Sequence, residues 1–406
     1  MKNMDTKRML LLLALLAAFP PLSTDMYLPA LPHLEKIWHE PTTAINLTLS
    51  GFFIGYCFSL LLYGPLSDKY GRRPPLLVGI SVYIIASLLS GFANGVASLT
   101  VLRIMQGAGA AAGSTISMAI TKDLYQGNDR QRILAYMGII MALAPMLAPV
   151  LGGWIMTGLS WHWVFYTQAA IGIIALGGVL RMQESLVTAS QGSILTALGM
   201  YGSLLRNRRY VVLIVLFSLI VLPHFSFIGS AAHIYISKFG LSEQVFGYFF
   251  AFNAMAIMAG SFACSRIQKR LSSRWLLTLS FAGILLGGIL MSMAFFHGPW
   301  RLAVPMALAS FAFGLSRPPS NHIVLEQVEH GAGAAASLMV FLYFIAGAFS
   351  MWFISLNWDD TIQIIGTLAC GVGGVVLLIW LLFPCLGSAD QKVPCWRNGN
   401  SSEPQD

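Results

Sequence analysis

Twelve apolar segments, each close to the length needed to cross a membrane, account for most of the 406-residue sequence. A helix of about 20 apolar residues spans the hydrocarbon core of a bilayer. In hydrocarbon every backbone N–H and C=O must pair within the protein, so only helices or closed β-barrels cross it, and barrel strands are much shorter than these segments. The sequence therefore predicts an all-α membrane protein with twelve transmembrane helices. The predicted spans are residues 9–31, 43–64, 75–92, 98–121, 133–156, 162–181, 211–236, 245–267, 275–296, 302–322, 333–356 and 361–383.

Composition supports the same fold class. Charged residues make up 10% of the chain and apolar residues 56%. A soluble domain carries about 25% charged residues. This composition excludes an ordinary soluble globular domain.

The loop between the second and third predicted spans, residues 64–73, reads GPLSDKYGRR; we call it the charged hinge. Asp68 and Arg72 are four residues apart, so their side chains can face each other or the end of a neighbouring helix. We expect Gly64 to let two helices approach closely and Gly71 to form a turn that other residues resist. An ordinary basic loop between two spans is the simpler alternative, and the full pattern favours a specific function.

A second acidic residue lies at the same membrane level as the charged hinge. Asp123 ends the fourth predicted span, in the sequence TKDLYQ. We expect it to join Asp68 and Arg72 in a three-member charge cluster, with Arg73 in the same inner-gate motif. The alternative is an acidic side chain solvated in a loop.

The positions of the basic residues predict the topology. All but four of the 24 Lys and Arg residues fall on one side of the predicted spans. The other side holds Lys36, Lys238 and Arg301, and Arg103 lies inside a span. Because cytoplasmic loops are enriched in Lys and Arg, both termini are predicted to be cytoplasmic. The net charge of +8 is dispersed over many loops and gives no indication of nucleic-acid binding.

The longest connection lies between the sixth and seventh spans and divides the chain into two halves. Each half has six predicted spans, and transporters are often built from two such bundles with a binding site at mid-membrane between them. The predicted divisions are an N-terminal six-helix bundle (1–185), a cytoplasmic linker (186–209), a C-terminal six-helix bundle (210–384) and a cytoplasmic tail (385–406).

Two charged residues fall inside predicted spans of the first half. Asp25 follows two prolines in PLSTDMYLPALP, and Arg103 precedes Gln106 and Gly107 in LRIMQGAGAA. Intramembrane charges are costly unless they are paired or reach a wet cavity, so they usually have a function. We expect Asp25 to carry protons and to have Arg103 as its counter-charge. The alternatives are a solvated acid at the end of its span and an arginine that extends outward to the interface.

The fifth predicted span contains the sequence MALAPMLAPVLGG. Pro145 and Pro149 each remove a helical hydrogen bond, and Gly152 and Gly153 permit close packing against a neighbour. We expect a bent helix that can slide against another helix. Bent spans occur in many membrane proteins, so this motif alone is not specific. It is informative mainly because it follows the motifs around Asp25 and Arg103 in the chain.

Several mid-span side chains are candidates for lining a ligand cavity. Aromatic side chains make adaptable apolar walls, although lipid contact is their commoner role. The cavity candidates are Tyr27, Tyr56, Asn253 and Phe252. His224 and His233 are weak candidates for proton coupling, because a lone histidine in a span is more often structural. The sequence has no metal-ligand spacing and no G-x-x-x-x-G-K-[ST] nucleotide motif, so we expect no metal and no cofactor.

These motifs together resemble those of the major facilitator superfamily, and most closely its twelve-span drug/proton antiporters of the bicyclomycin-resistance (Bcr/CflA) group. The resemblance covers about residues 9–384 and rests on PLSTDMYLPALP, GPLSDKYGRRP, RIMQGAGAA, KDLYQ, APMLAPVLGGW and SWHWVF. It implies the major facilitator fold, a bacterial inner-membrane location and a protein that functions as a monomer. One departure is that Ala144 and Ala148 replace glycines often found in the fifth-span motif.

The resemblance also implies roles for individual residues. The first-span acid, here Asp25, is a proton and cation site, and the fourth-span arginine, here Arg103, couples protonation to shape. The fifth-span motif around Pro149 is associated with antiport. The Asp68–Arg72 hinge with Asp123 is thought to hold the inner side closed against the eleventh helix.

The function expected on these grounds is efflux of drugs or xenobiotics, small apolar or amphipathic compounds, in exchange for protons. The main alternative is a proton-coupled transporter of a metabolite such as a sugar or amino acid. An enzyme would need a nucleophile–base pair or a metal cluster within the spans, and the sequence shows neither.

Overall fold

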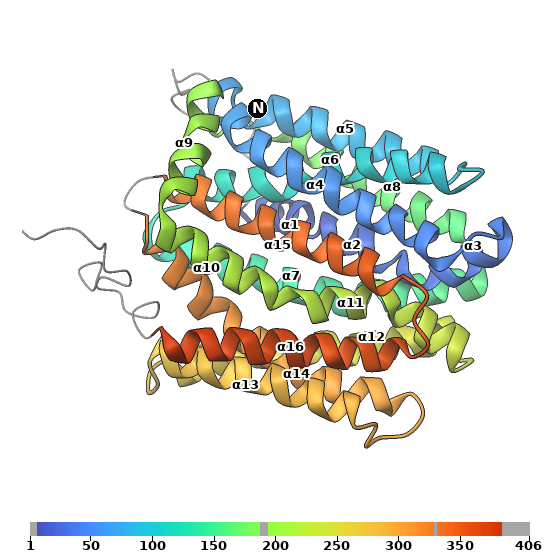
Figure 1. Ribbon diagram of the computed structural model, residues 1–406. Coiled ribbons are helices and arrows are strands. Elements are labelled where there is room, and N and C mark those ends of the chain that lie inside the picture. Colours follow the sequence, from blue (N-terminus) through green and yellow to red (C-terminus); the bar gives the residue numbers. More distant parts are fainter. Residues whose placement is uncertain (1–5, 187–193, 329–330, 384–406) are drawn as a thin grey trace, which may run out of the picture.

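The computed structural model describes residues 6–186, 194–328 and 331–383; the predicted tail, 385–406, lies outside this part of the chain. All regular structure among these residues is helical. The helices run side by side along one direction, with α4, α5 and α8 toward one side of the molecule and α13, α14 and α16 toward the other (Figure 1). The first half comprises α1 (Thr6–Ala17), α2 (Phe19–Asp25), the 3₁₀ turn η1 (Leu28–Ala30), α3 (Leu31–Trp38), α4 (Thr42–Tyr70), α5 (Arg73–Ser90), α6 (Val96–Leu124), α7 (Gly127–Gly158) and α8 (Trp161–Arg181).

The second half has the same kind of architecture. It comprises α10 (Arg208–Leu219), α11 (Val221–Ala232), the π-helical η2 (His233–Lys238), α12 (Glu243–Ile267), α13 (Ser273–Ser292), α14 (Trp300–Leu325), α15 (Ala332–Ile354) and α16 (Thr361–Leu382). Helix α9 (Ile194–Arg206) lies within the predicted linker and crosses one end of the molecule (Figure 1).

Helices occupy all twelve predicted spans, but not all of them pass a test of span length and apolarity. Among the described residues nine helical segments are long and apolar enough to cross a membrane. The number is ten if Thr6–Ala17 and Phe19–Trp38, which are bent by 46°, form one span. The two other helices, α6 and α14, are 29 and 26 residues long. They are long enough to cross a membrane, but they are not apolar enough to be counted. Both carry an arginine and small polar residues, so the count of twelve remains an expectation for these two helices.

The first helix of each half is broken near a proline. Proline has no N–H and cannot donate to the carbonyl four residues earlier. Pro20 and Pro21 follow the α1–α2 break at Ala18, and Pro223 follows the α10–α11 break at Ile220. These two breaks place the residues after them at the centre of the molecule, where the two halves meet.

The two halves contact each other through α4 with α15 and α7 with α12. Asn46 Nδ2 donates to the carbonyl of Gly229 at 2.9 Å, and Thr43 Oγ1 donates to that of Ser355 at 2.7 Å. These contacts lie toward the end of the molecule that is opposite the charged hinge. We call this end the distal end. At the hinge end, Tyr201 of α9 donates to the carbonyl of Leu61 at 3.1 Å. The linker helix thus packs against α4, and it also contacts α15.

Candidate functional site

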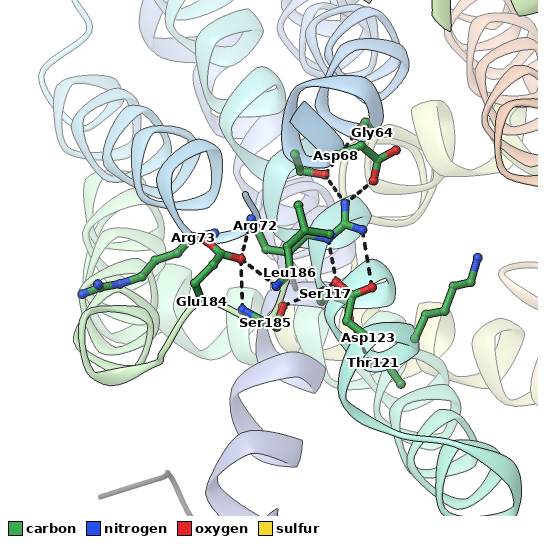
Figure 2. A network of polar contacts seen from close by, with 12 residues as sticks. Gly64, Asp68, Arg72, Arg73, Ser117, Thr121, Asp123, Glu184, Ser185 and Leu186 are labelled. Atoms are coloured by element: carbon green, nitrogen blue, oxygen red, sulfur yellow. Dashed lines mark hydrogen bonds and ion pairs between the residues drawn. The ribbon is translucent and has the colours of Figure 1, made fainter. Parts of the chain in front are cut away.

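The charged hinge forms the ion cluster expected from the sequence. The Arg72 guanidinium donates through Nε to Asp123 Oδ2 at 2.8 Å, and through Nη1 to the Asp68 carboxylate and to Ser67 Oγ (Figure 2). Arg72 is buried, although the Asp68 side chain is about half exposed. The end of α4, the start of α5 and the end of α6 are thereby joined. The predicted contact of Arg72 with both acids is confirmed.

Glu184, which the sequence analysis did not single out, completes the hinge from the segment after α8. Its carboxylate accepts backbone N–H bonds from Arg72 at 2.8 Å, from Arg73 at 3.0 Å and from Ser185 and Leu186 at 3.0 Å (Figure 2). The only clue in the sequence is that Glu184 follows the sixth span, at the same membrane level as the hinge.

The two hinge glycines differ. Gly71 has φ +91°, and a Cβ there would lie 2.6 Å from Glu184 Oε2, so both its backbone and its surroundings require glycine. Gly64 has open space where a Cβ would project, so the prediction of a close helix approach there was wrong. The Arg73 guanidinium donates through Nη2 to the carbonyl of Leu180 at 2.7 Å, and only its backbone N–H bonds a hinge acid, Glu184.

The charge on Glu184 should contribute to stability. Partial burial opposes ionisation, but the four backbone donors outweigh it and lower the pKa of Glu184. A carboxyl with a lowered pKa stabilises the fold above its unfolded-state pKa and loses that contribution as the pH falls through its folded-state pKa. Glu184→Gln is therefore expected to lower the melting temperature of the purified protein at pH 7, with the difference shrinking below about pH 4. Glu40→Gln, at an exposed site, is the control. An equal difference at both pH values would contradict this argument.

The hinge contacts described here join elements of the first half only. Asp68, Arg72, Asp123 and Glu184 bond to one another and to their own loops. No hydrogen bond or ion pair joins the hinge to α15 among the described residues, and residues 329–330, just before that helix, lie outside them. The expected closure against the eleventh helix through such bonds is therefore not seen in the described part of the chain.

Arg103 lies in the core of the first half, with no exposed surface. Its Nη1 donates to the Ser23 carbonyl at 3.0 Å and to Gln106 Oε1. The guanidinium also lies over the rings of Phe52, at 4.6 Å, and Tyr27, at 4.9 Å. The alternative of an outward extension toward the interface is therefore excluded.

The expected ion pair between Arg103 and Asp25 is absent. Helix α2 presents its Ser23 carbonyl to Arg103, whereas Asp25 accepts a bond from Thr24 Oγ1 at 2.9 Å and contacts the cavity described below. Arg103 of α6 therefore meets one side of the broken helix α2, and the Asp25 carboxylate projects from another side. Sequence spacing could not place them, because it does not fix the rotation of α2 against α6.

Gln106 extends the Arg103 network, as expected from its position one turn later. Its Nε2 donates to Ser87 Oγ and to Gln168 Oε1, both at 2.7 Å. Gln168 Nε2 in turn donates to the Ser23 carbonyl at 3.2 Å, the same carbonyl that Arg103 bonds. This polar network ties α2, α5, α6 and α8 together. Gln168 was missed in the sequence because a single glutamine in a span carries no recognisable pattern.

A cavity of about 170 Å³ lies between the two halves, and Asp25 forms part of its wall. The Asp25 side chain is otherwise buried. Most of the wall is apolar or aromatic, and it comes from both halves. The lining residues are Pro20, Pro21, Thr24, Asp25, Phe53, Pro145, His224, Phe225, Phe227, Ile228, Phe250, Asn253, Ala254, Ile257, Tyr343 and Phe344.

One of the four cavity candidates lines this space, namely Asn253. Tyr27 is buried and bonds Thr48 Oγ1 at 2.9 Å, so it belongs to the core of the first half. Tyr56 bonds Ser114 Oγ at 3.0 Å and packs edge-on against Phe344 of α15, but it is not among the residues that line the cavity. Phe252 is on the neighbouring face of α12 and packs edge-on against Trp300. Adjacent residues of a helix point about 100° apart, and this rotation separates Phe252 from Asn253.

The two histidines differ in position. His224 lines the cavity, and its ring stacks on Phe313 with the centroids 5.0 Å apart. His233 lies in η2 at the distal end, where its Nδ1 is 3.3 Å from Glu35 Oε2. Only His224 is near Asp25, so only His224 can act in the cavity.

The fifth-span motif packs as tightly as its small residues suggest. Helix α7 continues through Pro145, which lines the cavity, and Pro149. A Cβ on Gly152 would collide with the backbone of Met26, and one on Gly153 would collide with α12. Gly107 of α6 similarly lies directly against the backbone of α4. Gly153 therefore lies at the contact between the two halves, where any relative movement must occur.

Comparison with known proteins agrees with this architecture. Residues 13–351 match the family model described as Major Facilitator Superfamily. A Bacillus subtilis protein described as an uncharacterized MFS-type transporter, YdgK, is 30% identical over 353 residues, which is 85% of this chain and 88% of that protein. A bicyclomycin resistance protein homolog of Haemophilus influenzae is 28% identical and covers 92% of this chain and 95% of its own length. Multidrug resistance protein D of Escherichia coli is 26% identical, with coverages of 94% and 97%.

The fold itself has solved counterparts. The structure of a D-xylose-proton symporter superposes with a TM-score of 0.75 at 15% identity, covering 92% of this chain and 97% of that one. A nucleoside transporter, NupG, gives a TM-score of 0.72 at 13% identity, with coverages of 92% and 99%. At such identities these structures show the fold alone. The expected fold class and the expectation that the protein is not an enzyme are confirmed, and the chain belongs to the major facilitator superfamily of multi-pass membrane transporters.

Proposed function

We propose that the protein is a proton-driven efflux transporter that exports small apolar or amphipathic compounds in exchange for protons. The observation that carries this proposal is the Asp25 carboxylate in the wall of an otherwise mainly aromatic cavity between the two halves. A single acid in such a wall can hold either a proton or the polar group of a cargo. Mutually exclusive occupancy of one site is sufficient to couple the two flows.

The relatives support export over uptake. Two are described as resistance proteins, and the chain matches nearly their whole length. The alternative, a proton-coupled metabolite transporter, has support only from the shared fold of the D-xylose-proton symporter. An aromatic wall with few polar groups suits an amphipathic compound better than a sugar, which needs many hydrogen bonds.

The arrangement of the two halves supports a mechanism in which the cavity opens alternately to the two sides of the membrane. We place the protein in the bacterial inner membrane. The asymmetry of Lys and Arg supports a cytoplasmic hinge end with both termini on that side. The contacts of Asn46 and Thr43 across the halves then close the outer end in this state. Protonation or cargo binding at Asp25 would change the relative stability of this state and an outward-open one. We expect a monomer to be sufficient, since the cavity is built from one chain.

The test is expression in a strain that lacks its own drug pumps, followed by a compound panel. The proposal expects raised resistance to several amphipathic compounds, and cargo-driven proton release from everted vesicles. Accumulation of a metabolite in whole cells without any change in resistance would favour the alternative.

A further inference from the structure

His224 is a polar residue of the cavity wall that comes from the second half of the chain, whereas Asp25 comes from the first. His224 follows Pro223 just after the α10–α11 break, as Asp25 follows Pro20 and Pro21 just after the α1–α2 break. Interrupted helices at corresponding positions of the two halves mark the binding site in many transporters. Asp25 belongs to the first half and His224 to the second, so the two side chains line walls contributed by different halves.

His224 lacks a hydrogen-bond partner. Its Nδ1 is buried with no donor or acceptor nearby, and no bond to its other ring nitrogen occurs within the described part of the chain. Its neighbours are aromatic: Phe313 stacks on the ring and Phe225 packs against it edge-on. A buried polar group without a partner costs free energy, and a bound molecule can relieve that cost.

Two other polar residues of the wall, Asn253 and Thr24, already have hydrogen bonds within the protein. Asn253 Oδ1 accepts from Ser310 Oγ at 3.3 Å, and its amide group donates to the Phe249 carbonyl at 3.4 Å. The single hydroxyl proton of Thr24 is shared between the Pro20 carbonyl, 3.0 Å from Oγ1, and Asp25 Oδ1, 2.9 Å away. The Asp25 carboxylate, the His224 imidazole and the Tyr343 hydroxyl, which has no hydrogen bond within the described part of the chain, retain the capacity to bind a cargo.

A cation lies behind the His224 side of the cavity. The Arg317 guanidinium is 4.2 Å from the centroid of the Tyr343 ring, which lines the cavity, and 5.7 Å from that of Phe313. No carboxylate pairs with Arg317 among the described residues. The wall from the second half is therefore the electropositive one, and the wall from the first half carries the acid.

We propose that His224 is a specificity residue that hydrogen-bonds the cargo, so that the preferred substrates are organic cations carrying a hydroxyl or carbonyl group away from the charged end. This inference rests on the proposed function and adds the chemistry of the cargo. The cationic end faces Asp25, the apolar body lies against the aromatic walls, and the second polar group meets the imidazole.

The test is binding of two matched probes to the purified full-length protein by calorimetry. One probe is 3-phenylpropyl-trimethylammonium, and the other is the same ion with a 4-hydroxyl on its ring. We expect wild type to bind the hydroxylated probe about fivefold to tenfold more tightly, the effect of one hydrogen bond. His224→Phe should remove the preference, so that both probes bind with equal affinity, and His224→Gln should restore part of it.

His233→Phe is the matched control, because it replaces the other histidine of the same span and lies far from the cavity; the preference should survive. A thermal melt of each variant separates loss of the fold from loss of selectivity. A preference that persists in His224→Phe, its absence in wild type, or failure of both probes to bind would overturn the inference. The resistance and proton assays test the proposed function separately, so export without the preference would overturn only the role of His224.

Discussion

Replacing Asp25 by Asn is expected to reduce cargo-driven proton release to the background level while the protein still reaches the membrane. Asp25 is the only acidic side chain among the described residues that line the cavity, and an amide of the same shape cannot take up a proton at neutral pH. Its hydrogen bond comes from Thr24 on the same helix, so the substitution leaves the packing of α2 intact.

The measurement is proton release from everted vesicles on addition of an exported compound. The control is Asp129→Asn, an exposed carboxylate in the first turn of α7. Its proton release should match that of wild type. If Asp25→Asn also retained the wild-type signal, the proton pathway would have to use another group, and the proposed function would lose its main support.

Replacing Arg103 by Ala is expected to cause the largest loss of stability, about 3 kcal/mol or more. The side chain is fully buried, donates to Gln106 and the Ser23 carbonyl, and fills the space between Phe52 and Tyr27. Its removal leaves both a cavity and unpaired acceptors. The measurement is thermal unfolding in detergent, and Arg103→Met, which restores much of the volume but no donors, should be intermediate.

A double variant tests the separation of Arg103 from Asp25. Because Asp25 faces the cavity and Arg103 faces the core of the first half, the stability losses of Arg103→Ala and Asp25→Asn should add to within about 0.5 kcal/mol. A clear departure from additivity would show that the two charges interact after all. An interaction of that kind would restore the ion pair expected from the sequence.

Local chemistry made much of this protein predictable from its sequence. The apolar segments had to become helices, because hydrocarbon leaves the backbone no other way to satisfy its polar groups. The contact of Asp68 with Arg72 joins residues four apart on either side of the Gly71 turn, and that turn depends on a single backbone angle. Such features follow from near neighbours in the chain, so a motif suffices to predict them.

Other features depend on how separate helices rotate and pack, and only the tertiary structure decided them. Glu184 reaches the hinge from more than a hundred residues away, and Arg103 bonds the backbone of α2 rather than its acid. His224, rather than Tyr27 or Tyr56, shares the cavity with Asp25. The sequence determined which residues lie at membrane depth. Which face of each helix meets the cavity was decided by packing between helices, because a rotation of about 100° per residue gives each side chain a different neighbour.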